Sequence, residues 1–312
     1  KEDKRSMTME TAKSFLDKLE DTVKQHDLKF IEMRFAGGEP TMNKEIVVFI
    51  ADQMRKRFTN DKIRIELKLI TNGTLLNPEW IELLKTYSIS FCISLDGVRE
   101  WNDKTRPYTN GTGSFNQIHK NLEMCLKEGL RPGILTTITE NNIRGIPLLN
   151  RFLIDLNLPF RYAVYRDNVG SYSGYKSFIE NLLCVLNDCY AYYANAIRER
   201  NVSFNHQLAD IHLDRKLHLK SCNIGYSGVT VNHLGKVFLC QAGMDRAPIG
   251  DLSDKESLLQ MAWNQKTLPK LYDKVVTDYD KCKNCQWALV CGGGCPLVNS
   301  ATNGSPNTAS PY

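Results

Sequence analysis

The amino-acid sequence predicts an α/β fold built from β/α units with parallel strands, followed by a smaller cysteine-rich domain. Over the first half of the 312 residues, apolar runs of strand length alternate with segments whose apolar residues recur at helical spacing. Glycine-rich or polar loops follow the first three runs, and β/α units carry their functional loops at this end of the strands. Past about residue 215 the sequence changes to short strands, glycine and cysteine. We therefore expect two domains, residues 1–214 and residues 215–312.

The helices and strands of the first domain can be placed in order. Thr8 is a typical N-cap residue and predicts a helix that begins just after it. Asn77 is suited to cap a later helix, with Pro78 at its first position. Ser114 begins another helix, which Gly129 ends. Strands are expected at residues 30–35, 63–71, 89–95, 135–138 and 160–165, and one long helix rich in Tyr, Leu and Cys at residues 175–200.

The composition is that of an ordinary globular enzyme and excludes several classes of protein. Apolar residues make up 42% and charged residues 24% of the chain, and a formal net charge of +5 is modest for its length. The basic residues are spread out, so no nucleic acid is expected as a partner. No apolar run approaches the ~20 residues of a membrane span, so no membrane association is expected either. Ten cysteines in a chain this long favour a reduced, cytoplasmic protein over a disulfide-linked one.

Three loops that follow predicted strands carry candidate binding residues. Residues 37–40 read Gly-Gly-Glu-Pro, where glycine lets a ligand approach the backbone and a carboxylate can accept from an ammonium group. Residues 71–74 (Thr-Asn-Gly-Thr) and 94–97 (Ser-Leu-Asp-Gly) place small polar groups at the ends of the next two strands. Each loop, taken singly, is also compatible with an ordinary turn. Their order on successive strands favours one binding site at the edge of the sheet.

Six cysteines past residue 220 form two groups at short spacings, C-x12-G-x4-C and C-x2-C-x5-C-x3-C. The first group is Cys222 and Cys240, and the second is Cys282, Cys285, Cys291 and Cys295. Thiolates this close in sequence can converge on one metal centre, because little loop entropy opposes them. The spacing alone is compatible with iron–sulfur clusters and with a zinc site. The other four cysteines are expected to be packing residues: Cys92, Cys125, Cys184 and Cys189.

Together, the three loops and the cysteine groups resemble the radical S-adenosylmethionine enzymes of the SPASM subgroup, over nearly the whole chain. The resemblance implies an incomplete (β/α)6 barrel with a C-terminal SPASM domain, and S-adenosylmethionine and [4Fe–4S] clusters as cofactors. It also implies that the Gly-Gly-Glu-Pro loop contacts the amino group of S-adenosylmethionine and that the later strand ends contact its ribose and carboxylate. The residues concerned are Gly37, Gly38, Glu39, Pro40, Thr71, Asn72, Ser94 and Asp96. Arg106 is a further candidate for the carboxylate, and its alternative is an exposed loop arginine.

The same resemblance divides the cysteines between two interleaved auxiliary clusters. The implied ligands are Cys222, Cys240 and Cys295 for the first cluster, and Cys282, Cys285 and Cys291 for the second. The fourth site of the first cluster is either open, filled by substrate or filled by another residue. The C-x3-C-x2-C motif of the family's catalytic cluster is absent from these 312 residues. We expect that motif before Lys1, and the last cysteine of the family pattern after Tyr312.

The resemblance further implies that a 5′-deoxyadenosyl radical removes hydrogen from the substrate. SPASM enzymes commonly modify peptides, so the leading hypothesis is a maturase that forms a side-chain crosslink in a precursor peptide. Its partners would be that peptide and an electron donor such as flavodoxin or ferredoxin. An anaerobic sulfatase maturase is the enzyme alternative, although Gln241 stands where those enzymes carry Asp. A non-catalytic metal-binding scaffold is the alternative from another class.

Overall fold

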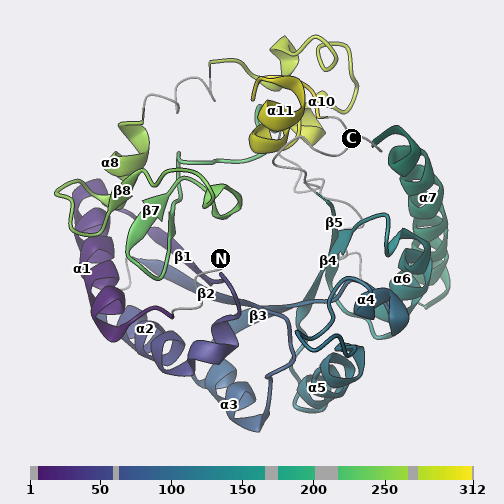
Figure 1. The fold of residues 1–312 in the computed structure, drawn as a ribbon, viewed down its shortest axis with the longest axis horizontal. Coiled ribbons are helices and arrows are strands. Elements are labelled where there is room, and N and C mark those ends of the chain that lie inside the picture. Colours follow the sequence, from purple (N-terminus) through teal and green to yellow (C-terminus); the bar gives the residue numbers. More distant parts are fainter. Residues whose placement is uncertain (1–5, 59–62, 166–174, 201–216, 266–272, 311–312) are drawn as a thin grey trace.

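Five parallel strands form a curled sheet, with helices on the outside of the curve (Figure 1). The computed structural model describes residues 6–58, 63–165, 175–200, 217–265 and 273–310. The strands neighbour one another in chain order: β1 (Phe30–Phe35), β2 (Arg64–Thr71), β3 (Ile89–Ser94), β4 (Gly133–Ile138) and β5 (Phe160–Val164). The prediction of an α/β partial barrel is confirmed, and we call this part the half-barrel.

Helix starts in the half-barrel follow local capping chemistry. Helix α1 (Met9–His26) begins where the Thr8 hydroxyl accepts from the Thr11 amide at 3.1 Å. Helix α3 (Pro78–Thr86) begins where Asn77 Oδ1 accepts from the Trp80 amide at 2.9 Å. Helix α5 begins beside Ser114 as predicted, but that hydroxyl makes no cap hydrogen bond. The remaining bounds are α2 (Lys44–Arg57), α4 (Glu100–Asp103), α5 (Phe115–Lys127), α6 (Ile146–Asp155) and α7 (Tyr175–Arg200).

The two faces of the curled sheet differ in chemistry, because alternate residues of a strand point to opposite faces. On the convex face, Leu67, Leu69, Ile93 and Ile134 are almost fully buried in the main hydrophobic core. The alternate positions are half-buried or exposed and include the charged residues of the strands. The helices therefore supply the core on one side of the sheet only.

The cysteine-rich region (residues 217–265 and 273–310) contains short elements. They are β6 (Thr230–Val231), β7 (Lys236–Phe238), β8 (Gly250–Asp251), α8 (Leu258–Trp263), α10 (Ala288–Cys291) and α11 (Pro296–Asn303), and the three strands are antiparallel. Helix α8 packs on α1, where the Leu258 amide donates to the Thr22 hydroxyl at 3.1 Å. The expected domain boundary at residues 214 and 215 lies outside the described residues. Within the described ranges, no helix combines the length and the apolar character needed to cross a membrane.

Candidate cofactor site and cysteine region

The Glu39 carboxylate joins the loops that follow β1 and β2. Its Oε1 accepts from the Thr71 hydroxyl at 2.7 Å, and from the amide and hydroxyl of Thr41 at 3.0 and 2.5 Å. Its Oε2 accepts from the Asn72 amide at 2.7 Å. A carboxylate offers about four lone-pair sites, so these four donors largely occupy it. Glu39, Thr71 and Asn72 are thus brought together as predicted, and their contacts fix the spacing between the two loops.

Gly37 and Gly38 are exposed at the carboxyl edge of the sheet. Gly37 has a φ of 108°, a conformation that favours glycine. A Cβ added at either glycine would meet no heavy atom of the described residues within 4 Å. A ligand can therefore come close to this backbone. Pro40 then begins the short 3-10 helix η1 (Pro40–Asn43), for which its fixed φ is suited.

The loop after β2 is fixed from helix α5 by a residue that the sequence did not single out. The buried Asn121 amide donates to the carbonyls of Gly73 and Thr74 at 2.8 and 3.0 Å. The Asn72 side chain is turned to its own loop, since its Oδ1 accepts from the amide and hydroxyl of Thr74. A Cβ at Gly73 would lie 2.9 Å from Ile93, which explains the glycine. Two loops of the predicted site are therefore rigidly connected to the rest of the half-barrel.

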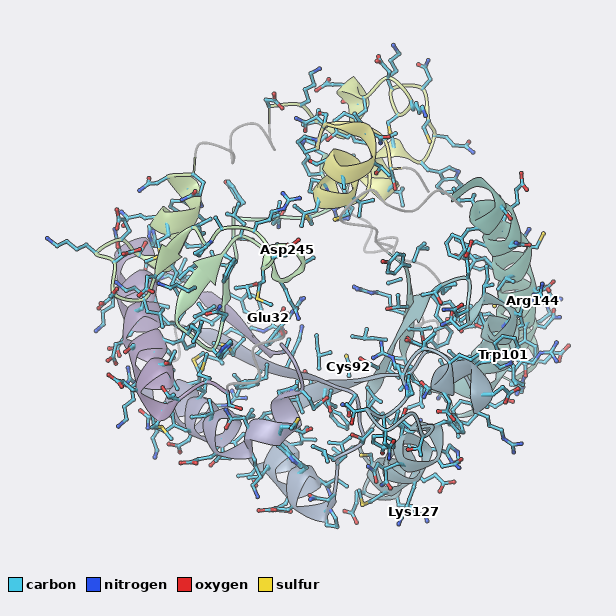
Figure 2. All side chains as sticks on the ribbon, viewed as in Figure 1. Glu32, Cys92, Trp101, Lys127, Arg144 and Asp245 are labelled. Carbon is cyan, nitrogen blue, oxygen red and sulfur yellow. The ribbon has the colours of Figure 1, made fainter. Side chains whose placement is uncertain are left out.

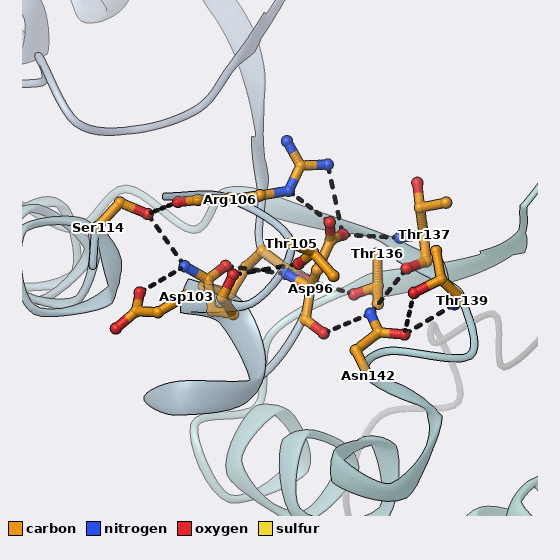
Figure 3. Close-up of polar contacts among 11 residues, drawn as sticks. Asp96, Asp103, Thr105, Arg106, Ser114, Thr136, Thr137, Thr139 and Asn142 are labelled. Atoms are coloured by element: carbon orange, nitrogen blue, oxygen red, sulfur yellow. Dashed lines mark hydrogen bonds and ion pairs between the residues drawn. The ribbon is translucent and has the colours of Figure 1, made fainter. Parts of the chain in front are cut away.

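Asp96 and Arg106 form an ion pair at the end of β3 (Figure 3). Arg106 Nε donates to Asp96 Oδ2 at 2.7 Å, and Nη2 donates to Oδ1 at 3.3 Å. Oδ1 also accepts from the Thr137 amide of β4 at 2.8 Å. The Asp96 side chain is 6% exposed and that of Arg106 31%, so Arg106 is an oriented, half-buried cation rather than an exposed loop arginine. Ser94 is half-buried two residues before Asp96, at the same edge.

Two fully buried asparagines hold this ion pair in place, and one of them, Asn142, is labelled in Figure 3. Asn142 donates to the carbonyls of Asp96 and Thr137 at 2.7 and 2.8 Å. Asn102 Oδ1 accepts from the Asp96 amide at 3.2 Å. Asn142 bonds across 46 positions of the sequence to Asp96, so no local pattern could have identified it. The loops after β3 and β4 are joined by these contacts, as those after β1 and β2 are joined by Glu39.

The segment that leads to Cys222 packs closely on the turn between Cys291 and Cys295. The Ser221 hydroxyl donates to the Gly294 carbonyl, and a Cβ at Gly292 would lie 2.6 Å from the Ser221 amide nitrogen. Gly292, Gly293 and Gly294 all have positive φ, so the turn between Cys291 and Cys295 requires glycine. Residue 222 is thereby held beside the C-x2-C-x5-C-x3-C run.

Lys220 makes a second connection between these segments. Its Nζ donates to the Tyr279 hydroxyl at 2.9 Å and to Asn307 Oδ1 at 2.8 Å, and burial lowers the pKa of its ammonium group. The Tyr279 carbonyl in turn accepts from the Cys282 amide at 2.8 Å. Burial also raises the pKa of Tyr279 to about 12, so its hydroxyl stays protonated at neutral pH.

The thiols themselves are only partly gathered. The Cys285 amide donates to the Cys282 carbonyl at 2.9 Å, and burial, followed by the negative charges of Cys291 and Cys285, raises the pKa of Cys282. Among the residues that the structure describes, no three Cys, His, Asp or Glu side chains are arranged to hold a metal ion. The donor set and the glycine turn nevertheless fit iron–sulfur clusters, which thiolates ligate.

The remaining cysteines divide into two kinds. Cys125 and Cys189 are buried, and burial raises the pKa of these thiols to about 11 and about 12, so their predicted packing role is confirmed. Cys184 is exposed on α7, where the prediction of a packing residue is wrong. Cys92 is half-buried on the sheet, and burial raises its pKa. The sequence placed Cys92 in an apolar strand but did not indicate which face it occupies.

The strand-end loops and the cysteine-rich region define a cofactor-dependent α/β half-barrel enzyme, and comparison with known proteins identifies its family. Residues 5–148 match the model of the Radical SAM superfamily, and residues 222–286 match SPASM, an iron–sulfur cluster-binding domain. The chain belongs to the radical SAM superfamily of enzymes and carries a SPASM domain, as the resemblance implied. The two domains imply [4Fe–4S] clusters.

Similar proteins include a sulfatase-maturating enzyme and a protein solved with a bound precursor peptide. The cysteine-type anaerobic sulfatase-maturating enzyme of Clostridium novyi (strain NT) is 27% identical over 283 residues, which cover 84% of this chain and 72% of the relative. The structure of anSMEcpe with bound AdoMet matches with a TM-score of 0.80 at 18% identity, covering 98% of this chain and 81% of that one. Streptococcus suis SuiB bound to its precursor peptide SuiA matches with a TM-score of 0.60 at 19% identity, covering 96% and 67%. At these identities, the structural matches show a shared fold.

Proposed function

We propose that this enzyme binds S-adenosylmethionine at the carboxyl edge of the half-barrel and forms a side-chain crosslink in a peptide substrate. The observation that carries the proposal is the pair of hydrogen-bonded loop connections at this edge, one through Glu39 and one through Asp96 and Arg106. They hold an open glycine backbone and an oriented guanidinium in fixed positions. When bound, S-adenosylmethionine and the catalytic cluster supply a 5′-deoxyadenosyl radical.

The amino-acid part of S-adenosylmethionine is a zwitterion, and the edge offers a group for each of its charges. The exposed Gly37 and Gly38 backbone receives the ammonium group. Arg106, oriented by Asp96, receives the carboxylate, because a guanidinium still has donors left after two bonds to one partner. Glu39, Thr71 and Asn72 act by holding the loops at the required spacing.

Two auxiliary clusters complete the proposal. Cys222, Cys240 and Cys295 hold the first cluster. Cys282, Cys285 and Cys291 hold the second. A reducing cytoplasm keeps these thiols available for iron, and a flavodoxin or ferredoxin delivers the electrons.

The similarity to sulfatase maturases supports a second candidate function, formylglycine formation. Gln241 argues against it. This residue begins the 3-10 helix η3 (Gln241–Gly243) directly after Cys240, and its side chain is an exposed amide. An amide cannot take up a proton as the Asp of those enzymes would. Crosslink formation is therefore the preferred reaction.

The test uses full-length protein with reconstituted clusters, a strong reductant and S-adenosylmethionine under strict anaerobiosis. We expect 5′-deoxyadenosine from the wild type and roughly tenfold weaker S-adenosylmethionine binding in Arg106→Gln, because a charge-assisted bond is lost. Arg144→Gln, on the outside of the half-barrel, is the matched control. No 5′-deoxyadenosine from cluster-loaded protein would refute the proposal. A peptide product that reacts with hydrazide, and so carries an aldehyde, would select formylglycine formation instead.

A further inference from the structure

All six charged side chains of the five-stranded sheet lie on its concave face. They are the cations Arg34, Arg64, Lys68 and Arg161 and the anions Glu32 and Glu66. Glu32 is opposite Glu66 and Arg34 is opposite Lys68 in the β1–β2 register, and residues two apart in a strand share a face. Figure 2 shows Glu32 and Cys92 inside the curve, whereas Lys127 and Arg144 lie outside it.

Several ion pairs form within this group of six side chains, and cations outnumber anions among them. Glu32 forms ion pairs with Arg34 and Lys68, and Glu66 forms ion pairs with Arg64 and with Lys68, the latter at 3.3 Å. Within the five strands, the four cations outnumber the two anions by two. Partly desolvated charge is costly and contributes nothing to the apolar core on the other face, so a role in packing does not account for it.

Cys92 shares this face with the cations, since Lys68 lies opposite Ser90, two residues before Cys92, and Arg34 lies opposite Lys68. Cys92 lies opposite Gly133, and a Cβ at that glycine would be 3.0 Å from the Cys92 sulfur. The Cys92 sulfur therefore covers Gly133 on this face, and Arg161 follows on β5, opposite Leu135. Arg161, Lys68 and Arg34 all act on the Cys92 thiol to favour its charged form, although burial outweighs them. An anion at this point of the concave face would therefore be stabilised by three cations.

We propose that the concave face around Cys92 recognises a carboxylate of the peptide substrate, with Arg161 and Lys68 as the specificity-determining residues. The inference rests on the proposed function and adds the chemical class of the substrate segment. A guanidinium binds a carboxylate through two parallel hydrogen bonds, and the Lys68 ammonium adds a compact charge beside it. Arg34, whose side chain is 62% exposed, can move toward the bound group.

The position of this site sets the spacing within the substrate. Cys92 precedes Ser94 by two residues and Asp96 by four on the same strand and its loop. At about 3.3 Å per residue, the carboxylate would lie roughly 7–13 Å from the cofactor-binding edge. An extended peptide spans that distance in about two to four residues. The residue to be modified should therefore stand two to four positions from an Asp, a Glu or the C-terminal carboxylate.

The first test uses Cys92 as a reporter of the local potential. Cluster-loaded protein is treated with anionic and with cationic methanethiosulfonate reagents, and the rate at each cysteine is followed by peptide mapping. Relative to exposed Cys184, we expect Cys92 to favour the anionic reagent by about tenfold. Arg161→Gln should reduce the ratio of the anionic to the cationic reaction rate at Cys92 about threefold or more. Glu32→Gln should raise the same ratio. Lys127→Gln, on the outer surface, should leave it unchanged. Equal preferences at Cys92 and Cys184 would overturn the inference.

The second test measures protection of Cys92 against iodoacetamide by three short blocked peptides, Gly-Glu-Glu-Gly, Gly-Gln-Gln-Gly and Gly-Lys-Lys-Gly. The Glu peptide should slow the reaction at roughly tenfold lower concentration than the Gln peptide. Equal protection by the Glu and Gln peptides, or better protection by the Lys peptide, would refute carboxylate recognition. Neither test requires cleavage of S-adenosylmethionine. An anion preference without 5′-deoxyadenosine formation would thus contradict the proposed function alone, and the reverse result would contradict only this inference.

Discussion

The edge of the half-barrel and the segment around α10 hold their candidate sites in different ways. At the edge, buried polar groups such as Glu39 and Asn142 are bonded across strands that rest on the main core. Around α10, the separate core among the described residues has three buried members, Val276, Tyr279 and Ala288, with Cys282 and Leu289 packed against them. The first candidate site is therefore held by the chain's own hydrogen bonds, and we predict that the second gains much of its order from the clusters that it binds.

Removing a proposed cluster ligand should have the largest effect. Cys282→Ser is expected to lose the iron of one auxiliary cluster and on the order of several kcal/mol of local stability, because metal binding replaces a large core there. Iron content and limited proteolysis measure both effects, and cleavage should appear around residues 273–310 while the half-barrel stays intact. Cys184→Ser, an exposed cysteine on α7, is the control. Wild-type iron and protease resistance in Cys282→Ser would contradict the comparison.

Breaking the buried hydrogen-bond network at the half-barrel edge should lower stability by less than the loss of a cluster ligand does. The loss should, however, affect unfolding of the whole half-barrel. Asn142→Ala leaves the carbonyls of Asp96 and Thr137 without their donor, at a cost of about 2–3 kcal/mol in the free energy of unfolding. Urea denaturation measures this loss. Asn141→Ala, at the exposed neighbouring position, should change it by less than about 0.5 kcal/mol. Matching denaturation midpoints for the two variants would count against a preorganised edge.

A smaller effect is expected for the loop connection itself. Glu39→Gln retains the shape of the side chain, but one oxygen becomes an amide NH2 group, which donates and cannot accept. Either the bonds from Thr71 and Thr41 or the bond from the Asn72 amide is then lost. We expect a loss of about 1–2 kcal/mol in stability and a parallel weakening of S-adenosylmethionine binding. Calorimetry of binding and of unfolding measures both. Glu45→Gln, exposed on α2, is the matched control. If Glu39→Gln bound S-adenosylmethionine with the affinity of the wild type, Glu39 would not position the loops.

The smallest effect is expected in the three-stranded sheet. A hydrogen bond from Lys236, and then bonds from Ser253, lower the pKa of Asp251 from 3.8 to about 2. Because the folded-state pKa is depressed, the pair stabilises the protein above the unfolded value of 3.8 and ceases to do so as the pH falls toward about 2. Since the pair is solvent-screened, Asp251→Asn should lower the Tm by about 2 °C or less at neutral pH. The difference in Tm between the wild type and Asp251→Asn should become steadily smaller below about pH 4. A constant difference from pH 7 to pH 3 would show that another contact is responsible.

Much of the half-barrel could be predicted because its signals are local. The Thr8 and Asn77 caps act within one helical turn, and both hydrogen bonds are present where the sequence indicated them. The five strands begin and end within two residues of their expected bounds, because an apolar run and its flanking turns are adjacent in sequence. The position of the site loops could then be predicted from the strands, because the ends of successive parallel strands meet at one edge of the sheet.

Roles within the site could not be predicted, because they depend on partners far away in sequence. Glu39 was expected to accept from a ligand, and its partner Thr71 lies 32 positions away. From the sequence, Arg106 could also have been an exposed loop arginine, and only its hydrogen bond to Asp96 excluded that interpretation. Asn121 and Asn142 carried no signal at all, since an asparagine in a helix or turn is ordinary in composition.

The sequence by itself determined the order of β/α units, the loop motifs at the strand ends and the cysteine spacing, because each is set by neighbouring residues. Only the tertiary structure decided which carboxylates the chain uses for its own connections and on which face Cys92 and six strand charges meet. The physical reason is that hydrogen bonds and Coulomb interactions act over a few ångströms in space. Sequence separation does not report that distance until the strands are in register.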